Sequence, residues 1–371
     1  MHSRRILHCI ASMLGGGAER QLAYLTAEFV KRGWETHVAL IQEGPNLSRL
    51  ISNGVIVHRL SCSGNHDPRL AVRLYDVMRQ LDPVAVQTWL PQMDIIGGTV
   101  CLASGTPWVL SERGSGFGYG RGLKARIRRI LGSHSGAVVA NSTVALDYWQ
   151  EFGLRHSPTR RVIANIVPLD EIDGVEPATQ VHGLALSGDQ WVIYAGRLEP
   201  AKNVRTLLRA LELAVQNSKA KALICGDGSL RSEMEEYIQE RRLGHKLVMC
   251  GYVSTLCGLL KRSSAFVSLS GSEGSPNAVL EAMACRCPII VSDIPGHREL
   301  LDDASALFVP SNSAEMAAAA ILKVLEGAPA VFARAELARR SVMDRKAERV
   351  AEQYEDVYQL VAGAHSVLTA P

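Results

Sequence analysis

The sequence predicts an α/β protein built from two doubly wound parallel sheets. Short apolar segments of strand length alternate with amphipathic helical segments in both halves of the chain, a pattern typical of parallel sheets covered by helices. The alternation fades between residues 165 and 190, where prolines, glycines and acids accumulate, and then begins again. A length of 371 residues is sufficient for two hydrophobic cores.

The first half of the chain contains six strand-like segments separated by helical ones. The expected strands are Arg5–Ala11, Thr36–Ile41, Val55–Leu60, Val84–Thr88, Trp108–Ser111 and Ala137–Ala140. The expected helices include Ala18–Lys31, Arg69–Leu81 and Asp94–Ser104. Gly33 follows the first of these helices and has the position of a C-terminal cap.

The second half repeats this organisation. The expected strands are Trp191–Ala195, Lys221–Cys225, Lys246–Cys250, Ala265–Leu269, Pro288–Val291 and Ala306–Val309. The expected helices are Val204–Gln216, Leu230–Arg242, Asn277–Cys285, Ala314–Leu325 and a long final helix, Arg345–Val361.

These patterns predict the domain boundaries. We expect an N-terminal domain over residues 1–168, a linker over 169–189 and a C-terminal domain over 190–344. The last segment, 345–371, is expected to pack back toward the N-terminal domain. Ligands of doubly wound sheets bind at the carboxyl ends of the strands, so we expect the two domains to face each other across a cleft that holds the site.

Composition excludes several classes of protein. Aromatic residues make up only 5% of the chain, which argues against a stacking surface for single-stranded nucleic acid, and a net charge of +3 is too small to indicate polyanion binding. The eight cysteines form no CxxC pair of the kind that holds zinc, and their apolar surroundings favour buried thiols in a reducing compartment.

The N-terminal segment has two interpretations. Arg4 and Arg5 followed by the apolar run Ile6–Leu14 resemble a weak signal peptide, but a first strand that enters a loop explains the same residues. No other stretch reaches the apolar length that spans a bilayer. We therefore expect a cytoplasmic protein.

Three motifs follow predicted strands. The first is Gly15-Gly16-Gly17-Ala18-Glu19-Arg20, whose glycines would let the backbone approach a phosphate at a helix start. A plain tight turn would explain the same glycines. The motif is not GxGxxG and no acid closes the second strand, so a dinucleotide dehydrogenase fits poorly.

The second motif is the segment Gly196–Asn203, with the sequence GRLEPAKN. Arg197 offers a bidentate fork and Lys202 a point charge, both suited to a diphosphate. Asn203 has the position of an N-cap for the next helix. A solvated turn with two surface cations is the alternative.

The third motif, Ser272–Met283, has the sequence SEGSPNAVLEAM. Ser275 could cap the helix and Pro276 suits its first position, so the amides of Asn277–Val279 would form an anion site. Glu273 precedes this helix and Glu281 lies within it, where one carboxylate could meet sugar hydroxyls and the other ribose hydroxyls. The alternative is a capped helix with two solvated acids.

The sequence resembles the retaining glycosyltransferases of family 4. The features that carry this resemblance are the Glu-x7-Glu pair Glu273 and Glu281, GRLEPAKN, the sequence GDGSL at Gly226–Leu230, the tripeptide Gly251–Val253 and the glycine-rich loop. These enzymes have the GT-B fold, with two doubly wound Rossmann-like domains. The similarity runs in order along nearly the whole chain.

The resemblance implies roles for these residues. Arg197 and Lys202 would neutralise the leaving diphosphate and, with Glu273, form the catalytic group, while Glu281 would bind the ribose. The N-terminal domain would hold the acceptor and the C-terminal domain the nucleotide-sugar donor. The implied donor-binding residues are Gly16, Gly17, Arg197, Lys202, Asp227, Gly228, Tyr252, Val253, Glu273, Gly274, Ser275, Pro276, Asn277, Ala278, Val279 and Glu281. A simple strand-to-helix turn is the alternative for Asp227 and Gly228.

The family chemistry is sugar transfer with retention from a nucleotide diphosphate sugar to a glycan or lipid-linked acceptor, in synthesis of cell-surface polysaccharide or lipopolysaccharide. Two cations and helix-start amides would stabilise the leaving group, so no metal or other cofactor is expected, and the chain lacks a DxD cluster. Many relatives carry a first-domain histidine near the sugar. The corresponding stretch here has none, and Ser111, Glu112 or Arg113 are the candidates for that space on the acceptor side.

A basic segment accompanies these motifs. Ile127, Ile130 and Leu131 share a helical face and are surrounded by cations, which would suit contact with an anionic membrane at its cytoplasmic face. An ordinary surface helix docked on the sheet is the alternative. The cations are Arg121, Lys124, Arg126, Arg128 and Arg129.

The sequence is also compatible with two other functions. A nucleotide-sugar epimerase or hydrolase of the same fold would use a similar donor site without an acceptor. A non-catalytic partner subunit would keep the fold without the chemistry, although Arg197, Lys202, Glu273 and Glu281 are all present.

Overall fold

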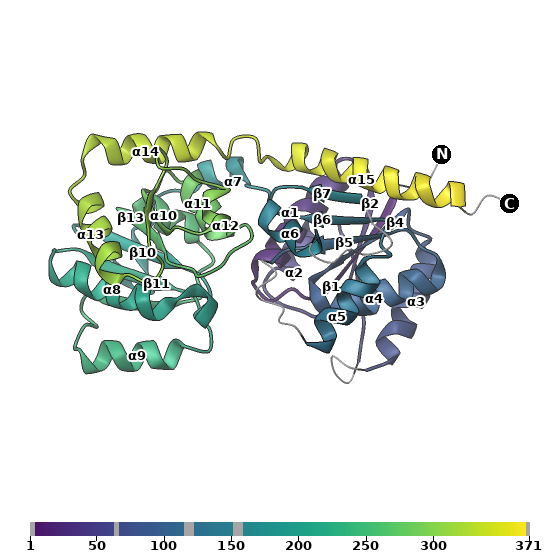
Figure 1. Ribbon diagram of the computed structural model, residues 1–371, viewed down its shortest axis with the longest axis horizontal. Coiled ribbons are helices and arrows are strands. Elements are labelled where there is room, and N and C mark those ends of the chain that lie inside the picture. Colours follow the sequence, from purple (N-terminus) through teal and green to yellow (C-terminus); the bar gives the residue numbers. More distant parts are fainter. Residues whose placement is uncertain (1–3, 63–66, 115–121, 151–158, 369–371) are drawn as a thin grey trace. The chain divides into compact units, whose positions relative to one another are not determined.

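The computed structural model describes residues 4–62, 67–114, 122–150 and 159–368 of the chain, which forms two compact units (Figure 1). Unit 1 comprises Met1–Ile166 and Arg345–Pro371, and unit 2 comprises Val167–Asp344. Each unit contains a parallel sheet with helices on both faces, which is the α/β class that the sequence predicts.

The sheet of unit 1 has seven parallel strands in the order β3-β2-β1-β4-β5-β6-β7. The order reverses between β1 and β4, which is the topological switch point of a doubly wound sheet. The strands are β1 (Arg5–Ser12), β2 (Glu35–Gln42), β3 (Ile56–Arg59), β4 (Ala85–Trp89), β5 (Trp108–Glu112), β6 (Ala137–Ala140) and β7 (Thr159–Val162).

The helices of unit 1 cover both faces of this sheet. They are α1 (Gly17–Lys31), α2 (Leu47–Ser52), α3 (Arg69–Leu81), α4 (Leu90–Ser104), α5 (Leu123–Gly132), α6 (Thr143–Gln150) and α15 (Ala347–Leu368). Because side chains alternate along a strand, Ile6 and Ile10 of β1 belong to the core under α1 and α15, whereas Leu7 and Cys9 belong to the core under α3 and α4.

Helix α15 is an integral part of unit 1, along which it runs in Figure 1. Tyr354 and Tyr358 are fully buried, and the hydroxyl of Tyr358 donates to Gln87 in β4. Glu355 accepts two hydrogen bonds from Arg32, at 3.0 and 2.9 Å, and one from the indole of Trp34 at 2.7 Å. The C-terminal helix therefore packs on the N-terminal half of the chain through buried and charge-assisted contacts.

The sheet of unit 2 has six parallel strands in the order β12-β11-β10-β13-β14-β15, with its switch point between β10 and β13. The strands are β10 (Trp191–Ala195), β11 (Lys221–Cys225), β12 (Leu247–Gly251), β13 (Ala265–Ser268), β14 (Ile289–Ser292) and β15 (Leu307–Val309). The helices are α7 (Leu169–Asp173), a 3₁₀ turn (Pro200–Lys202), α8 (Val204–Gln216), α9 (Arg231–Glu240), α10 (Leu256–Arg262), α11 (Asn277–Ala284), α12 (Pro295–Arg298), α13 (Ala314–Leu325) and α14 (Pro329–Arg340).

The two faces of this sheet carry separate cores. Helices α8, α9 and α13 pack on one face through residues such as Leu207 and Ile321, and α10, α11 and α14 pack on the other through residues such as Leu260 and Val279 (Figure 1). The carboxyl ends of β10 and β13 thus emerge from a sheet that is buried on both sides. This rigid frame supports the loops that carry the predicted motifs.

The expected linker over 169–189 is instead part of unit 2. It contains α7 and a small antiparallel pair, β8 (Gln180–Val181) and β9 (Leu184–Ala185), and its apolar side chains enter the unit 2 core. Leu169, Ile172 and Leu186 are at most 4% exposed. Burial of these side chains stabilises the segment on the domain surface, so the prolines and glycines mark turns rather than a free connection.

Candidate active site

Two loops of unit 2 meet at its switch point and bring together two of the predicted catalytic residues. Lys202 ends the 3₁₀ turn after β10, and Glu273 lies in the loop after β13. The ammonium of Lys202 donates to Glu273 Oε1 at 2.5 Å, and the two side chains are 20% and 10% exposed. A backbone hydrogen bond of 3.0 Å from Gly271 to Ala201 joins the same loops. The predicted phosphate cation and the predicted sugar ligand thus form a largely desolvated ion pair.

Arg197 lies on the same loop and is exposed. Its guanidinium makes no hydrogen bond or ion pair with any described residue, whereas its carbonyl accepts from the hydroxyl of Tyr194 at 2.9 Å. Tyr194 is buried beneath the loop, and burial raises the pKa of its phenol, as does the nearby carboxylate of Glu273. A buried neutral phenol therefore supports the loop and leaves the guanidinium able to bind an anion.

The GDGSL segment packs tightly against the GRLEPAKN loop. Gly226 has φ +144°, and a Cβ there would lie 1.8 Å from the carbonyl oxygen of Gly196. A Cβ at Gly228 would lie 2.5 Å from the carbonyl oxygen of Leu198. These glycines allow two backbones to touch, which is a structural reason for their presence. Glu199 adds to the contact by accepting from the amide and the hydroxyl of Ser229 at 3.1 and 2.7 Å.

The side chain of Asp227 does not contribute to this contact. Its carboxylate is exposed and accepts from Arg231 at 3.1 Å and from the amide of Gly228 at 2.8 Å. These interactions are those of an ordinary strand-to-helix turn with an i,i+4 ion pair. The structure therefore gives Asp227 a local role at the start of α9.

The start of α11 differs from the prediction. Pro276 is the N-cap rather than the first helical residue, and Ser275 lies one position before it. The amide of Val279 donates to the carbonyl of Pro276 at 3.1 Å, so this amide is used inside the helix. The amide of Val279 is therefore not available to the anion site that the sequence predicts from three amides. Ala278, in contrast, is half-buried and its amide makes no backbone hydrogen bond with the described residues.

The remaining residues of the Glu-x7-Glu motif are buried or nearly so. Glu281 is 9% exposed within α11, and Gly274 is buried in the loop before it. The tripeptide at the end of β12 lies beside the GDGSL loop, because Gly226 donates to the carbonyl of Gly251 at 2.7 Å. Tyr252 is 53% exposed there, and Val253 is half-buried.

A second N-cap differs as well. Asn203 precedes α8, as expected, but it has φ +51° and its side chain makes no capping hydrogen bond to the helix backbone. The side chain instead accepts from the hydroxyl of Thr206 at 2.8 Å and donates to the carbonyl of Ser311. Asn tolerates this left-handed conformation, so Asn203 supports the sharp turn out of the 3₁₀ segment.

The glycine-rich loop of unit 1 ends at the N-terminus of α1. Gly16 is the N-cap and Gly17 the first helical residue. The carboxylate of Glu19 folds back over Gly16, where an added Cβ would lie 2.3 Å from Glu19 Oε2. Glu19 is 7% exposed and accepts from the hydroxyl of Ser12 at 3.4 Å. In this structure an acid therefore lies beside the amides that were expected to meet phosphate.

The acceptor-side candidates make internal contacts in unit 1. Ser111 and Glu112 are fully buried, and the hydroxyl of Ser111 accepts from Gln87. Glu112 Oε2 accepts from Arg128 at 2.8 Å and from the indole of Trp149 at 3.0 Å. These contacts leave little of either side chain for a substrate.

Arg113 is the third acceptor-side candidate and is also held internally. Its guanidinium lies 4.2 Å from the ring centre of Trp89 and donates to Asn165 at 3.1 Å and to the hydroxyl of Tyr354. This arrangement links β5 to α15.

The basic segment corresponds to helix α5, and one of its cations is not at the surface. Arg128 is 1% exposed and donates to Asp94 at 2.7 Å and to Glu112 at 2.8 Å, so its assignment to a membrane surface is wrong. Burial raises the pKa of Asp94 to about 6, against the opposing effect of Arg128. Arg121 lies outside the described residues.

The exposed face of α5 is nevertheless apolar and basic. Leu123, Ile127 and Ile130 are 73%, 37% and 49% exposed, and they lie at i, i+4 and i+7 on one face. Lys124 and Arg126 are exposed beside them, and Arg129 is half-buried. Leu131, which was expected on this face, is half-buried against the unit 1 core.

Two further kinds of feature concern the residues that the structure describes. No group of three or more His, Cys, Asp or Glu side chains among them could hold a metal ion. None of the described helices alone has the length and apolarity to cross a bilayer; α13 and α14 would qualify only as a pair bent by 101°.

The sequence patterns assign no site role to three residues beside the motifs. Ser270 donates to Glu273 Oε1 at 2.6 Å, and the fully buried His297 lies in α12, the short helix after β14. Glu19 covers Gly16 in unit 1. The contacts of these residues depend on tertiary packing, so no local sequence pattern distinguishes them from solvated side chains.

Comparisons with known proteins agree with this organisation. A family model described as Glycosyltransferase Family 4 matches residues 15–171, and one described as Glycosyl transferases group 1 matches residues 180–342. The chain belongs to glycosyltransferase family 4. The two matches divide the chain close to the boundary between units 1 and 2.

Two bacterial proteins are similar in sequence to this chain. The N-acetylgalactosamine-N,N'-diacetylbacillosaminyl-diphospho-undecaprenol 4-alpha-N-acetylgalactosaminyltransferase of Campylobacter jejuni is 29% identical over 159 residues, which are 42% of this chain and 41% of the relative. The putative teichuronic acid biosynthesis glycosyltransferase TuaC of Bacillus subtilis is 28% identical over 239 residues, 61% of this chain and 58% of the relative. The chain thus matches less than two thirds of the length of either relative.

The structure of Anabaena HepE in complex with UDP and glucose superposes with a TM-score of 0.85, at 18% identity, over 95% of this chain and 98% of that one. This likeness identifies the GT-B fold of family 4, with its two Rossmann-like parallel sheets.

Proposed function

We propose that this family 4 protein transfers a sugar from a nucleotide diphosphate sugar to a hydroxyl of a glycan or lipid-linked acceptor. The transfer retains the configuration at the anomeric carbon and needs no metal. The acceptor belongs to the synthesis of cell-surface polysaccharide or lipopolysaccharide, as the names of the relatives from Campylobacter jejuni and Bacillus subtilis suggest. The protein works in the cytoplasm.

The observation that carries this proposal is the meeting of Lys202 and Glu273 at the switch point of unit 2. Ligands of doubly wound sheets bind where the strand order reverses, and here the loops after β10 and β13 supply a cation and an acid at that place. Arg197 adds an exposed guanidinium on the same loop as Lys202. A nucleotide diphosphate sugar suits both charges, because its diphosphate binds cations and its sugar hydroxyls can donate to a carboxylate.

The chemistry follows from these charges. As the bond from the anomeric carbon to the diphosphate breaks, negative charge grows on the departing phosphate and positive charge on the sugar. Lys202 and Arg197 stabilise the phosphate, and the start of α11 adds the positive end of its helix dipole. Glu273 contacts the sugar, and Glu281 binds the ribose. Lys202 and Arg197 supply the positive charge that a metal ion supplies in metal-dependent enzymes, so the rate should be unchanged in EDTA.

The first experiment identifies the donor. The purified chain is mixed with a panel of nucleoside diphosphates and their sugars, including UDP-glucose, and its thermal unfolding is followed. The matching nucleotide sugar should raise the unfolding temperature, and the protein should release nucleoside diphosphate from it when acceptor is supplied. A chain that binds no member of the panel and releases no nucleotide would contradict the proposal.

Product analysis with a donor labelled in the sugar separates the alternatives. Label that enters an acceptor indicates transfer, whereas label recovered as free sugar or as an epimer indicates a hydrolase or an epimerase. Absence of any product from every donor would favour a non-catalytic partner subunit. The anomeric proton couplings of a transferred product test retention directly.

The exposed face of α5 supports a peripheral contact with an anionic membrane, where a lipid-linked acceptor would be found. Leu123, Ile127 and Ile130 would enter the interface, with Lys124, Arg126 and Arg129 as the basic rim.

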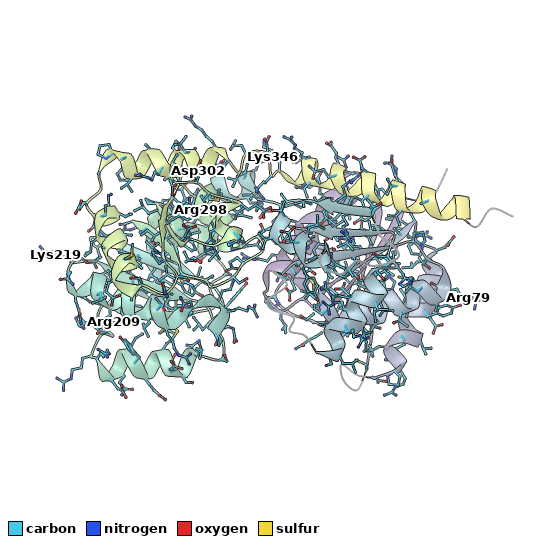
Figure 2. All side chains as sticks on the ribbon, in the orientation of Figure 1. Arg79, Arg209, Lys219, Arg298, Asp302 and Lys346 are labelled. Carbon is cyan, nitrogen blue, oxygen red and sulfur yellow. The ribbon has the colours of Figure 1, made fainter. Side chains whose placement is uncertain are left out.

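Sedimentation with vesicles of anionic lipid tests this contact. Replacement of Lys124, Arg126 and Arg129 by alanine should release the protein from the vesicles. A triple replacement of Arg69, Arg73 and Arg79 on α3 removes the same charge and should not; Figure 2 labels Arg79 on unit 1. Equal binding of the two variants would contradict a role for α5.

A further inference from the structure

Glu273 is held by two donors on one of its carboxylate oxygens. Oε1 accepts from Lys202 at 2.5 Å and from the hydroxyl of Ser270 at 2.6 Å. Oε2 accepts no hydrogen bond from the residues that the structure describes. Ser270 itself is 1% exposed, so it is buried away from solvent.

Ser270 is in turn fixed by a buried network from the end of β14. The hydroxyl of Ser292 donates to the carbonyl of Ser270 at 2.6 Å. His297 Nδ1 lies 2.8 Å from the carbonyl oxygen of Ser292, and a carbonyl can only accept, so Nδ1 carries the hydrogen. Both Ser292 and His297 are fully buried, and burial lowers the pKa of His297.

The backbone of Glu273 is fixed from the same side. A Cβ at Gly296 would lie 2.3 Å from the carbonyl oxygen of Glu273, which shows how closely α12, the helix after β14, packs on it. Glu273 is therefore restrained at its backbone by Gly296 and at Oε1 by Ser270, independently of Lys202. Only the restraint by Lys202 involves a charge that a bound anion could attract.

We propose that Ser270 is a positioning residue that keeps Oε2 of Glu273 directed at the donor sugar after the diphosphate draws Lys202 away from Oε1. This inference rests on the proposed function. A diphosphate carries more negative charge than a carboxylate, so Lys202 turns toward it when it binds. The hydrogen bond from Ser270 then alone prevents the carboxylate from rotating, and a hydroxyl of the sugar donates to Oε2.

The test compares Ser270→Ala and Ser270→Thr with Ser263→Ala as a control. Ser263 lies at the end of α10 in the same unit, and its hydroxyl donates only to the backbone carbonyl of Leu259, at 2.7 Å. Affinities are measured by calorimetry for the nucleoside diphosphate that wild type binds best and for its nucleotide sugar, with UDP and UDP-glucose as the first pair.

Loss of a hydrogen bond to a charged group should weaken binding of the nucleotide sugar about tenfold in Ser270→Ala, while the affinity for the nucleoside diphosphate changes less than about twofold. Ser270→Thr keeps the hydroxyl and should restore the sugar-dependent affinity. Ser263→Ala should change neither affinity. Equal loss of both affinities in Ser270→Ala, or no loss of either, would overturn the inference.

A double-mutant cycle shows whether Ser270 acts through Glu273. In a Glu273→Ala background, adding Ser270→Ala should cause no further loss of nucleotide-sugar affinity, because the group that Ser270 positions is absent. Additive losses would overturn the inference while leaving the proposed function intact. A wild-type protein that binds no nucleoside diphosphate would instead overturn the proposed function, and this inference with it.

Discussion

Lys202 and Glu273 neutralise each other across the switch point of unit 2, with their charged atoms 2.5 Å apart. The two residues are 71 positions apart in sequence and come from loops that follow adjacent strands, β10 and β13. The pair holds two residues of the proposed site in contact with each other. It also implies that an anion entering the site competes with Glu273 for the ammonium.

Replacing Lys202 tests the role of this cation in the reaction. Lys202→Ala should lower the turnover number by at least about a hundredfold, because the departing phosphate loses a fixed charge in a site of low polarity. Lys219→Ala is the matched control, since Figure 2 shows Lys219 at the periphery of unit 2, where it follows α8. Turnover is measured as nucleoside diphosphate released per enzyme. Rates within twofold of wild type in Lys202→Ala would contradict the phosphate role.

Replacing Glu281 tests the proposed ribose contact. Glu281→Ala should weaken donor binding by about tenfold or more, since a carboxylate that accepts from ribose hydroxyls makes charge-assisted hydrogen bonds. The free nucleoside diphosphate should lose affinity to the same extent as the nucleotide sugar, because both contain the ribose. Glu236→Ala, an exposed acid on α9, is the control. Unchanged donor affinity, measured by calorimetry, would show that Glu281 has no such contact.

Hydrophobic periodicity was enough to predict most of the fold. The helices Arg69–Leu81, Val204–Gln216 and Ala314–Leu325 and the strands Trp191–Ala195 and Lys221–Cys225 have the bounds that the pattern indicates. These segments bury one continuous face, so burial and period agree. The composition of segment 169–189 is misleading, because its prolines and glycines suggest a free linker whereas a few buried side chains such as Leu186 decide its packing.

Pairings between distant residues could not be predicted from the sequence. Asp94 and Glu112 are 34 and 16 positions from Arg128, and nothing in the local pattern of α5 shows that they neutralise it. Helix α5 also departs from the usual burial of apolar residues and exposure of charged ones, since Leu123 and Ile127 are exposed while Arg128 is buried. The motif residues were found because they follow predicted strands. Ser270 was not, because its role depends on where the hydroxyl points.

The buried ion pairs of Arg128 predict a large effect on stability. Arg128→Met leaves Asp94 and Glu112 buried without a cation, which should lower the free energy of unfolding by about 3–5 kcal/mol at pH 8. Arg126→Ala on the same helix removes an exposed cation and should change it by less than about 0.5 kcal/mol. Denaturant unfolding followed by tryptophan fluorescence reports mainly on unit 1, which contains Trp34, Trp89, Trp108 and Trp149.

The defect of Arg128→Met should be smaller at pH 5 than at pH 8. Asp94 already has a folded pKa of about 6 with Arg128 present, above the ordinary value of 3.8, and removal of the cation raises it further. A group with a raised folded pKa takes up its proton in the folded state first, so acid stabilises the folded form relative to the unfolded one. A defect that grows on acidification would contradict the assignment of the buried charge.

His8 predicts an opposite dependence on pH. It is fully buried in β1, and its Nδ1 accepts from the indole of Trp89 at 3.2 Å. Burial and, to a smaller extent, the nearby guanidinium of Arg113 together lower the pKa of His8 to about 3. The rings of Phe29 from α1 and Tyr358 from α15 also face it, at 6.2 and 6.5 Å between centres. A protonated His8 would therefore meet a donor, a cation and apolar rings.

The sign of the effect follows from the lowered pKa. Between about pH 6.5 and pH 3 the unfolded chain binds a proton at His8 and the folded chain does not, so stability is lost as the pH falls through this window. At pH 5 the loss relative to pH 8 amounts to about 2 kcal/mol for this group. His8→Gln should remove this contribution and flatten the pH dependence of unfolding by that amount, whereas His134→Gln, at an exposed position on unit 1, should not. An unchanged slope in His8→Gln would mean that His8 takes up its proton equally in the folded and unfolded chains.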